Sequence, residues 1–365
     1  MASSALAATR ARIAQLDVEI ERLQRLLDPL LAERDKCQQT IVDYKYPILT
    51  LPAEIASEIF LQFIPSYPER PSFWGFQSPS FLFQICRQWR DVALTTPALW
   101  STMELVLELS GYHAQQLDLL KIWLERSGGC GLSIRLEYIE DEDDDIGIIG
   151  ECVDALLCHV SRWQDMEIIA PFEDLRKIAG SMPLLRSVTI GTECWPDVLP
   201  EAPAALFTNA PALKHVVLAK TFNPFLVALP WSQVTTLEAQ ALYAREAIEI
   251  LRHTTVLEDC AVTIHNGQPS TASSIPPLPL RSLGSLRLQS VAGITDGMCQ
   301  FFKALRLPVL QTLSVREAFL GLDPVATLSA VCPNGCPQEI EIFHARTPQE
   351  VYAGAFPLAS LTVLS

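Results

Sequence analysis

Apolar residues near the N-terminus recur at alternating steps of three and four positions. Within residues 6–43 these steps run through Ile13, Leu16, Ile20, Leu23, Leu27 and Leu30. The spacing predicts an amphipathic or coiled-coil helix over residues 1–44, in which these residues alternate between heptad positions a and d. The seam weakens at Arg34 and Cys37, and Pro29 predicts a kink because it lacks a backbone N–H donor. Three interpretations stay open: packing on the helix's own domain, pairing with a second copy, or pairing with a partner helix.

A second, shorter helix is predicted after Thr50. Its apolar residues form one stripe, made of Ile55, Ile59, Phe60 and Phe63. Thr50 can cap this helix, with Pro52 near the first turn and Glu54 where a carboxylate favours the helix dipole. A proline-rich loop over 65–79 separates it from a helix predicted over 81–93, after which Leu99 and Trp100 are expected to open a strand.

The remaining two thirds of the chain repeat an apolar triplet, in which an anchor is followed by apolar residues three and five positions later. The clearest triplets begin at Leu185, Leu213, Val234, Leu257, Leu283 and Leu310, and looser ones at Trp100, Trp163, Pro337 and Leu358. Because the last two positions of a triplet alternate, each predicts a short strand with one buried face. Apolar stripes at helical spacing between the strands predict helices.

A strand and a helix that recur every 21 to 28 residues resemble a leucine-rich repeat. The asparagine or cysteine usual eight positions after the anchor is missing, since Glu193, Thr221 and Leu242 stand at the first three of these positions. The resemblance therefore implies an irregular α/β leucine-rich-repeat-like solenoid over residues 101–365. A compact α/β domain with a parallel sheet is the competing architecture.

The segment 45–100 resembles an F-box. The family pattern is Leu-Pro-x-Glu-Ile, Ile-Phe, Val-Cys-x-x-Trp-Arg and Leu-Trp, in that order. This chain carries it as Leu51-Pro52-Ala53-Glu54-Ile55, Ile59-Phe60, Ile85-Cys86-Arg87-Gln88-Trp89-Arg90 and Leu99-Trp100. The segment looks like the fungal, mushroom-type members, although its 65–79 loop is longer than usual. A plain helical hairpin is the alternative. The overall expectation is an α+β chain: heptad helix, helical F-box and repeat domain.

The F-box resemblance implies binding to a Skp-type adaptor, which bridges to a cullin and a RING-bound ubiquitin-conjugating enzyme. The adaptor would cover an exposed apolar face formed by Leu51, Pro52, Ile55, Ile59 and Phe60. Cys86 and Trp89 would be shared between this interface and the internal core. A contiguous apolar face of this kind is unusual on a free monomer and typical of an interface.

Composition narrows the class of protein further. The chain has 365 residues, 49% of them hydrophobic, with 42 acidic against 27 basic residues and a net charge of −15. An acidic surface repels phosphate, which disfavours nucleic-acid partners, and it gains little from anionic lipid. No apolar run suits a membrane span or a signal peptide, and ten scattered cysteines suit a reducing compartment. We expect a soluble protein of the cytoplasm or nucleus.

Several polar groups resemble metal sites, but each has a simpler interpretation. Residues 140–145 are six consecutive acids, which suit a solvated loop or a patch for a basic substrate better than a calcium loop lacking its twelfth-position glutamate. Cys332, Cys336 and His344 supply too few ligands for a zinc site. Cys152, Cys158 and His159 are expected on a helix that faces largely into the core. No nucleotide-binding or hydrolase motif is present, so we expect no catalytic residue, metal or cofactor.

These features predict a substrate receptor of an SCF-type cullin–RING ubiquitin ligase, with no chemistry of its own. In a solenoid, positions two and four after each anchor point outward onto a concave face, the usual binding surface of such repeats. Among these positions we expect His215, Thr236 and Arg287 to bind the protein substrate. Two other functions stay open: an F-box scaffold without ubiquitin transfer, and a compact α/β enzyme of unknown activity.

Overall fold

The computed structural model describes most of the chain in two compact units, residues 1–59 and 60–365. The described residues are 2–44, 47–65, 67–107, 113–139, 147–192, 203–220, 223, 226–265, 275–291, 293, 295–335, 337–355 and 360–364. The first unit is helical, and the second holds the sheet.

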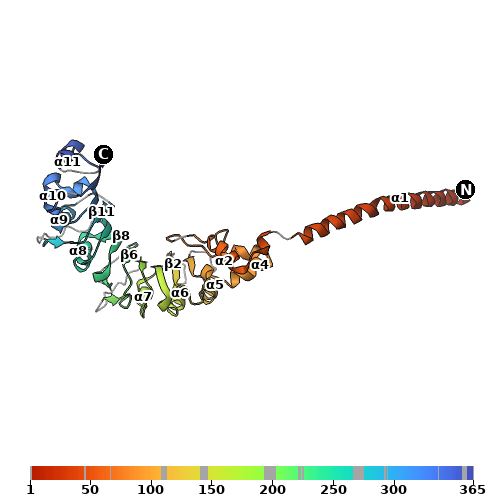
Figure 1. Cartoon of the computed structure of the whole chain (residues 1–365), viewed down its shortest axis with the longest axis horizontal. Coiled ribbons are helices and arrows are strands. Elements are labelled where there is room, and N and C mark those ends of the chain that lie inside the picture. The colour runs from red at the N-terminus through yellow and green to blue at the C-terminus, as the bar shows by residue number, and fades with distance from the viewer. Residues whose placement is uncertain are drawn as a thin grey trace. The chain divides into compact units, whose positions relative to one another are not determined.

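The first unit consists of one long helix and the start of a short one (Figure 1). The helix α1 (Ala2–Asp43) has 42 residues and continues through Pro29, so the predicted N-terminal helix is confirmed. A 3-10 turn (η1, Pro47–Thr50) precedes α2 (Ala53–Leu61), whose first turn holds Glu54 as predicted. The backbone N–H of Ala56 donates to the carbonyl of Pro52 at 3.0 Å, so Pro52 supplies the first acceptor of α2.

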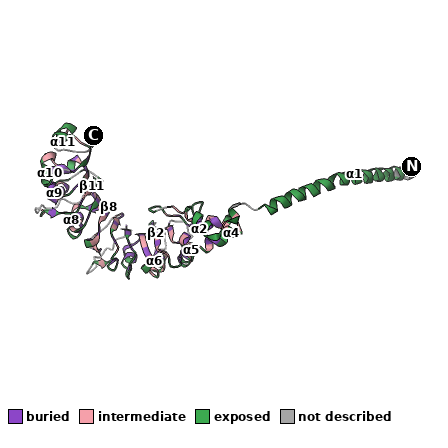
Figure 2. Ribbon diagram, in the orientation of Figure 1, coloured by how far each residue is buried: buried purple, intermediate pink, exposed green. Residues whose placement is uncertain are grey.

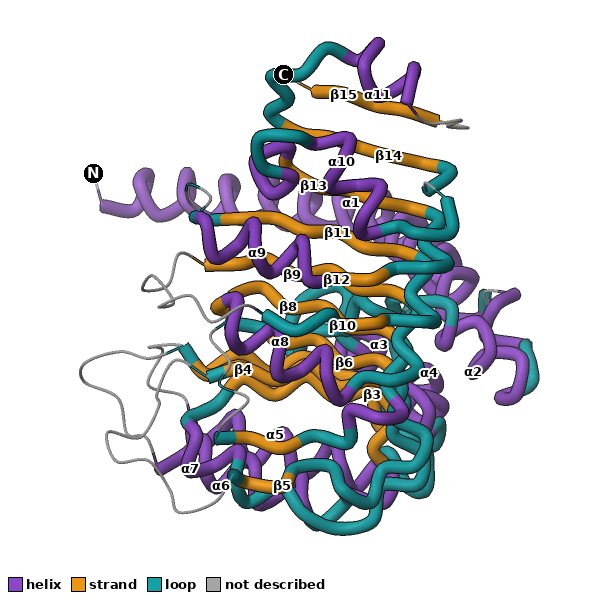
Figure 3. Tube along the Cα trace, turned by 90° about the vertical axis from the view of Figure 1, so that its left-hand side faces the viewer, coloured by secondary structure: helices purple, strands orange, loops and turns teal. Residues whose placement is uncertain are grey.

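The second unit is built on one parallel sheet of eleven described strands, whose order across the sheet follows the chain (Figure 3). In that order the strands are β1 (Thr102–Leu107), β2 (Leu132–Tyr138), β3 (Trp163–Ile169), β4 (Ser187–Gly191), β6 (His215–Leu218), β8 (Thr236–Tyr243), β9 (Asp259–His265), β11 (Ser285–Ser290), β13 (Thr312–Arg316), β14 (Glu339–Phe343) and β15 (Ser360–Leu364). Two short parallel ladders are separate from it: β5 (Ala204–Ala205) with β7 (Val227–Ala228), and β10 (Leu278–Pro279) with β12 (Leu305–Arg306).

Helices or 3-10 turns lie in most of the connections between strands, because parallel neighbours need a crossover rather than a hairpin. The helices of this unit are α3 (Leu82–Ile85), α4 (Arg87–Leu94), α5 (His113–Arg126), α6 (Gly147–Leu157), α7 (Phe172–Leu175), α8 (Ala244–His253), α9 (Asp296–Ala304), α10 (Pro324–Val331) and α11 (Gln349–Ala355). The 3-10 turns are η2 (Pro79–Phe81), η3 (Pro97–Trp100), η4 (Val160–Arg162), η5 (Trp231–Gln233) and η6 (Glu317–Leu320). The unit is therefore mixed α/β, as predicted, and α5 to α10 follow one side of the sheet (Figure 1).

The apolar triplets form the core between the sheet and these helices (Figure 2). The residue three positions after each anchor pairs with its counterpart in the next strand, in a row that includes Val188, Val216, Leu237, Cys260, Leu286, Leu313 and Ile340. Every residue of this row is at most 2% exposed. The predicted strands and their buried face are thus confirmed, and the burial is continuous because each triplet lies beside the next.

An aromatic cluster joins the helices before β1 to the first helix of the sheet unit. Trp100 packs edge-on against Trp123 of α5 with ring centroids 4.9 Å apart, and it stacks on Phe83 of α3 at 5.5 Å. The Arg126 guanidinium lies 4.7 Å from the Trp100 ring centroid, within cation–π range. The indole N–H of Trp100 donates to the carbonyl of Ala93 at 3.0 Å, so this large side chain is buried without leaving a polar group unpaired.

Two local predictions are wrong in detail. The helix predicted over 81–93 is divided into α3 and α4, because Cys86 adopts an extended backbone with φ −160° and ψ 169° and becomes the N-cap of α4. Leu99 and Trp100 lie in the turn η3 rather than in a strand, and β1 begins only at Thr102. In both places a side chain that caps or anchors the backbone interrupts the regular element.

Near the last described strands, a buried carboxylate connects η6 to α11. Glu317 accepts hydrogen bonds from the Tyr352 hydroxyl at 2.7 Å, from the Thr347 backbone N–H at 2.9 Å, and from the Arg346 backbone N–H. Burial alone raises the pKa of the Glu317 carboxyl, but the hydrogen bonds outweigh burial and hold the pKa below its ordinary value. The ionised carboxylate therefore stabilises this end of the sheet unit.

Replacing Glu317 with glutamine should lower the free energy of unfolding by about 1–3 kcal/mol, because three donors lose a charged acceptor. A carboxyl with a depressed folded-state pKa stabilises the fold above its unfolded-state pKa of about 4.3, and this contribution disappears as the pH falls through the folded-state value. The difference between wild type and Glu317→Gln should therefore be full near neutral pH and shrink in acid. Urea unfolding at a series of pH values measures it. Glu258→Gln, at an exposed glutamate, is the control, and a pH-independent difference would contradict this role.

Candidate functional site

The first candidate surface is an apolar pair on α2. Ile55 and Ile59 lie one helical turn apart and are 49% and 45% exposed. Pro52, just before the helix, is exposed as well, and Leu51 is half-buried. Ala56, on the adjacent stripe of the helix, is buried. The helix therefore has an inner apolar stripe and an outer one, and a protein partner could cover the outer stripe.

The prediction that Phe60 belongs to the exposed face is wrong, since the residue is only 3% exposed. Its ring packs against Trp89 of α4, with centroids 4.9 Å apart and planes at 52°. The backbone N–H of Trp89 donates to Cys86 Sγ at 3.5 Å, which caps α4. Cys86 and Trp89 stay half-buried. These three residues hold the end of α2 against α4.

The long loop before η2 is anchored on the sheet, and we call its residues 67–79 the strap. The backbone N–H of Glu104 in β1 donates to the Pro71 carbonyl at 2.9 Å, and Ser72 forms a parallel bridge with Glu104. Phe73 is buried and packs edge-on against Trp123 of α5 at 4.9 Å between ring centroids. The strap therefore pairs with the outer edge of β1, which would otherwise present unpaired backbone groups to another chain.

Side chains of the strap extend across the next three strands. Arg70, whose side chain is 5% exposed, donates to Glu167 on β3 at 3.1 Å and to Ser133 on β2 at 3.2 Å. The Tyr67 hydroxyl lies 3.0 Å from the Ser187 hydroxyl on β4. Ser187 points outward from the sheet as predicted but is buried, because the strap covers it.

The charged groups beneath the strap form one ion-pair network. Arg135 of β2 forms ion pairs of 2.9, 2.6 and 3.2 Å with Glu104, Glu137 and Glu167 respectively. Burial raises the pKa of the Asp165 carboxyl, and the neighbouring cations, Arg70 first, offset this only in part. This part of the sheet face is occupied by the chain itself and offers few groups to a partner.

The second candidate surface is the part of the sheet face that begins at β6, beyond the strap. His215 of β6 pairs in register with Thr236 of β8, and Arg287 of β11 lies in the next outward row, beside Ala261 of β9. Arg287 is exposed, and His215 and Thr236 are half-buried. The structure thus brings the three predicted substrate-binding residues onto one face, in reach of a single partner. Tyr67 and Arg70 of the strap contact β2, β3 and β4, which precede this part of the face.

Sequence reasoning missed Tyr67 and Arg70, although the strap carries a usable signal. Pro65, Pro68 and Pro71 recur at every third position, the period of an extended polyproline segment. An extended segment can follow a strand edge and place alternate side chains on the sheet. The spacing predicts the conformation, but only the folded structure reveals which strands the segment crosses.

Within the described ranges, the remaining titratable and nucleophilic groups do not form a site. The acidic run at 140–145 and Cys336 lie outside the described residues. Cys152 is buried as predicted, and burial raises the pKa of its thiol to about 12, so the thiol stays protonated and unreactive. Cys158 is exposed rather than in the core, because α6 ends at Leu157.

Across the described ranges, no three histidine, cysteine, aspartate or glutamate residues lie close enough together to hold a metal ion. None of the described helices combines the length and the apolar character that a membrane crossing requires.

Comparisons with known proteins assign no family to the chain. No family model matches it, and no curated protein matches it either. Its function therefore has to be inferred from the residues and their geometry.

Replacing Arg70 with alanine should loosen the strap and lower the free energy of unfolding by about 1.5–3 kcal/mol, the range for hydrogen bonds to charged groups. The loss should not exceed this range, because Glu167 keeps its ion pair with Arg135. Urea unfolding measures the loss, and amide hydrogen exchange at Glu104 should become faster. Arg281→Ala, at an exposed arginine, is the control. Unchanged exchange at Glu104 would mean that the Arg70 side chain does not hold the strap.

Proposed function

We propose that this chain is a substrate receptor of an SCF-type cullin–RING ubiquitin ligase. Its F-box-like segment, residues 45–100, binds a Skp-type adaptor, and its repeat-like sheet binds a protein substrate. The observation that carries the proposal is the exposed pair Ile55 and Ile59, because it lies on the helix that directly follows the Leu51-Pro52 motif. In this proposal the receptor performs no chemistry itself. It holds the substrate near the transferring enzyme and so raises the effective concentration of the substrate there.

The adaptor interface is proposed to centre on the outer stripe of α2. Covering the exposed halves of Ile55 and Ile59 would contribute about 2 kcal/mol, which is too little for a stable complex alone. Pro52 and Leu51 precede the pair and add further apolar surface. Phe60 contributes from within, because it packs on Trp89 rather than facing the adaptor.

The substrate interface is proposed to lie on the sheet face beyond the strap. Strand order follows chain order and equivalent triplet positions share one register, which supports a leucine-rich-repeat-like solenoid. In such an arrangement the outward positions of successive strands form one continuous surface. The outward residues here are mixed in charge, with Glu238 and Asp259 close to His215 and Arg287, which suits a protein partner.

The double change Ile55→Asp with Ile59→Asp should abolish binding of a recombinant Skp-type adaptor in a pull-down. Two carboxylates would replace the apolar pair, and both positions are exposed, so the sheet unit should stay folded by circular dichroism. The matched control is Ile122→Asp with Val256→Asp, at two exposed apolar residues elsewhere. Full adaptor binding by the α2 variant would rule out this helix as the adaptor-binding element.

The triple change His215→Ala, Thr236→Ala and Arg287→Ala should leave adaptor binding intact. The reconstituted ligase should then no longer capture and ubiquitylate most of the proteins that the wild type takes from cell extract. A triple change with the same residue types, Arg252→Ala, His253→Ala and Thr255→Ala, alters exposed positions at and just after the end of α8 and serves as the control. Equal losses for both variants would contradict the assignment of the sheet face. Capture without ubiquitylation by the wild type would identify a scaffold instead.

A further inference from the structure

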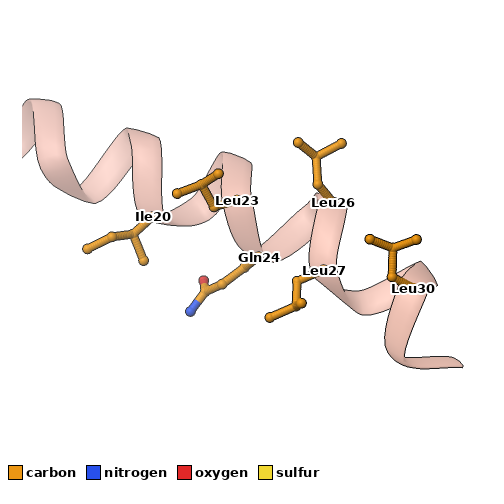
Figure 4. Close-up of a pocket in the computed structure, with 6 residues that line it drawn as sticks. All are labelled: Ile20, Leu23, Gln24, Leu26, Leu27 and Leu30. Carbon is orange, nitrogen blue, oxygen red and sulfur yellow. The ribbon is translucent and has the colours of Figure 1, made fainter. Parts of the chain in front are cut away.

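The apolar stripe of α1 is uncovered in the single chain. Its six heptad residues, Ile13, Leu16, Ile20, Leu23, Leu27 and Leu30, are between 45% and 61% exposed. An apolar groove follows this side of the helix, lined by Ile20, Leu23, Gln24, Leu26, Leu27 and Leu30 (Figure 4). Most of the stability of a natural helix comes from packing its apolar face, so a stripe of this length needs a partner.

Charged side chains are kept off the stripe. Arg22 pairs with Glu19 at 2.9 Å and Arg25 pairs with Glu21 at 3.0 Å, each within the helix and fully in solvent. Pro29 lies two residues after Leu27, at an outward heptad position, so its ring does not enter the seam. The helix therefore has a polar outer side and an apolar seam, the division typical of a coiled coil.

We propose that α1 pairs with α1 of a second copy of this chain as a parallel, two-stranded coiled coil. The residue types at the seam indicate the number and the direction of the strands. Ile13 and Ile20 are β-branched residues at position a, and leucine occupies all three d positions, the combination that favours parallel dimers over larger bundles. This pairing does not depend on adaptor binding.

Two of the three flanking pairs over these heptads are complementary in the same register. In a parallel dimer each g residue faces the e residue of the following heptad on the other copy. Arg12 would then face Asp17, which are opposite charges, and Leu26 would face Leu31, which widens the apolar seam by one layer. Arg34, at the next a position, is paired with Asp35 at 2.6 Å and ends the continuous apolar seam.

The mass of the full chain in solution tests the pairing. Sedimentation over a concentration series should give twice the monomer mass of 40.4 kDa at the upper end. The change Ile20→Asp with Leu23→Asp should shift the mass to that of the monomer. Val18→Asp with Val42→Asp is the matched control, because both valines are exposed on the outer side of the same helix. A monomer at every concentration, a trimer, or a dimer that survives the seam variant would overturn the proposal.

The direction of the two helices is tested separately, because the aspartate variant could also unwind α1. Cys37 occupies a d position, so two parallel copies bring their Cys37 thiols face to face, whereas antiparallel copies place them about 45 Å apart at 1.5 Å per residue. In a Cys158→Ser background, a short bismaleimide should link the wild-type seam into a covalent dimer. Cys37→Ala with Gln39→Cys moves the thiol to the outer side and should not link. A dimer without a Cys37 link would overturn the parallel arrangement.

Discussion

The parallel register of the sheet is the constraint on which the rest of the second unit depends. Side chains alternate along a strand, so a slip by one residue would turn buried side chains such as Val216 and Leu286 toward solvent. The row of apolar residues that begins at Met103 and reaches Ile340 is paired strand by strand, which penalises a slip at every position at once. The same register fixes the outward row, in which His215, Thr236 and Asp259 become neighbours.

A sheet with a fixed register still has two edge strands, and the strap covers the edge formed by β1. The strap pairs with β1 through Pro71 and Ser72, and Arg70 then crosses to Glu167. A buried arginine is stable there only because its guanidinium is paired and hydrogen-bonded. The consequence is a division of the face: the first four strands bind the strap, and only later strands offer groups to another molecule.

Features that depend on the pattern within one segment could be predicted from the sequence, whereas features that depend on contacts between distant segments could not. The heptads of α1 and the triplets of the sheet are periodic patterns, so their spacing along the chain is enough to identify the helix and the strands. The burial of Phe60 could not be predicted, because it depends on Trp89, which lies on another helix. The break at Cys86 and the anchoring of Tyr67 on Ser187 depend likewise on contacts between distant segments. The heptads of α1 predict a helix with an apolar stripe, but they leave open whether its own domain, a second copy or another helix packs on that stripe.

The part of the sheet face that the strap covers also affects how a partner could bind. With the strap over β1 to β4, a substrate on one chain would meet side chains from the later strands only, many of them small or half-buried, such as Thr236 and Ser285. Contacts of this kind contribute little individually. Two chains joined through α1 would present two such faces, and a substrate with two copies of the recognised motif would bind the second face intramolecularly. Such linkage strengthens binding by about 10²–10⁴ without any new contact, provided that both faces can be engaged together.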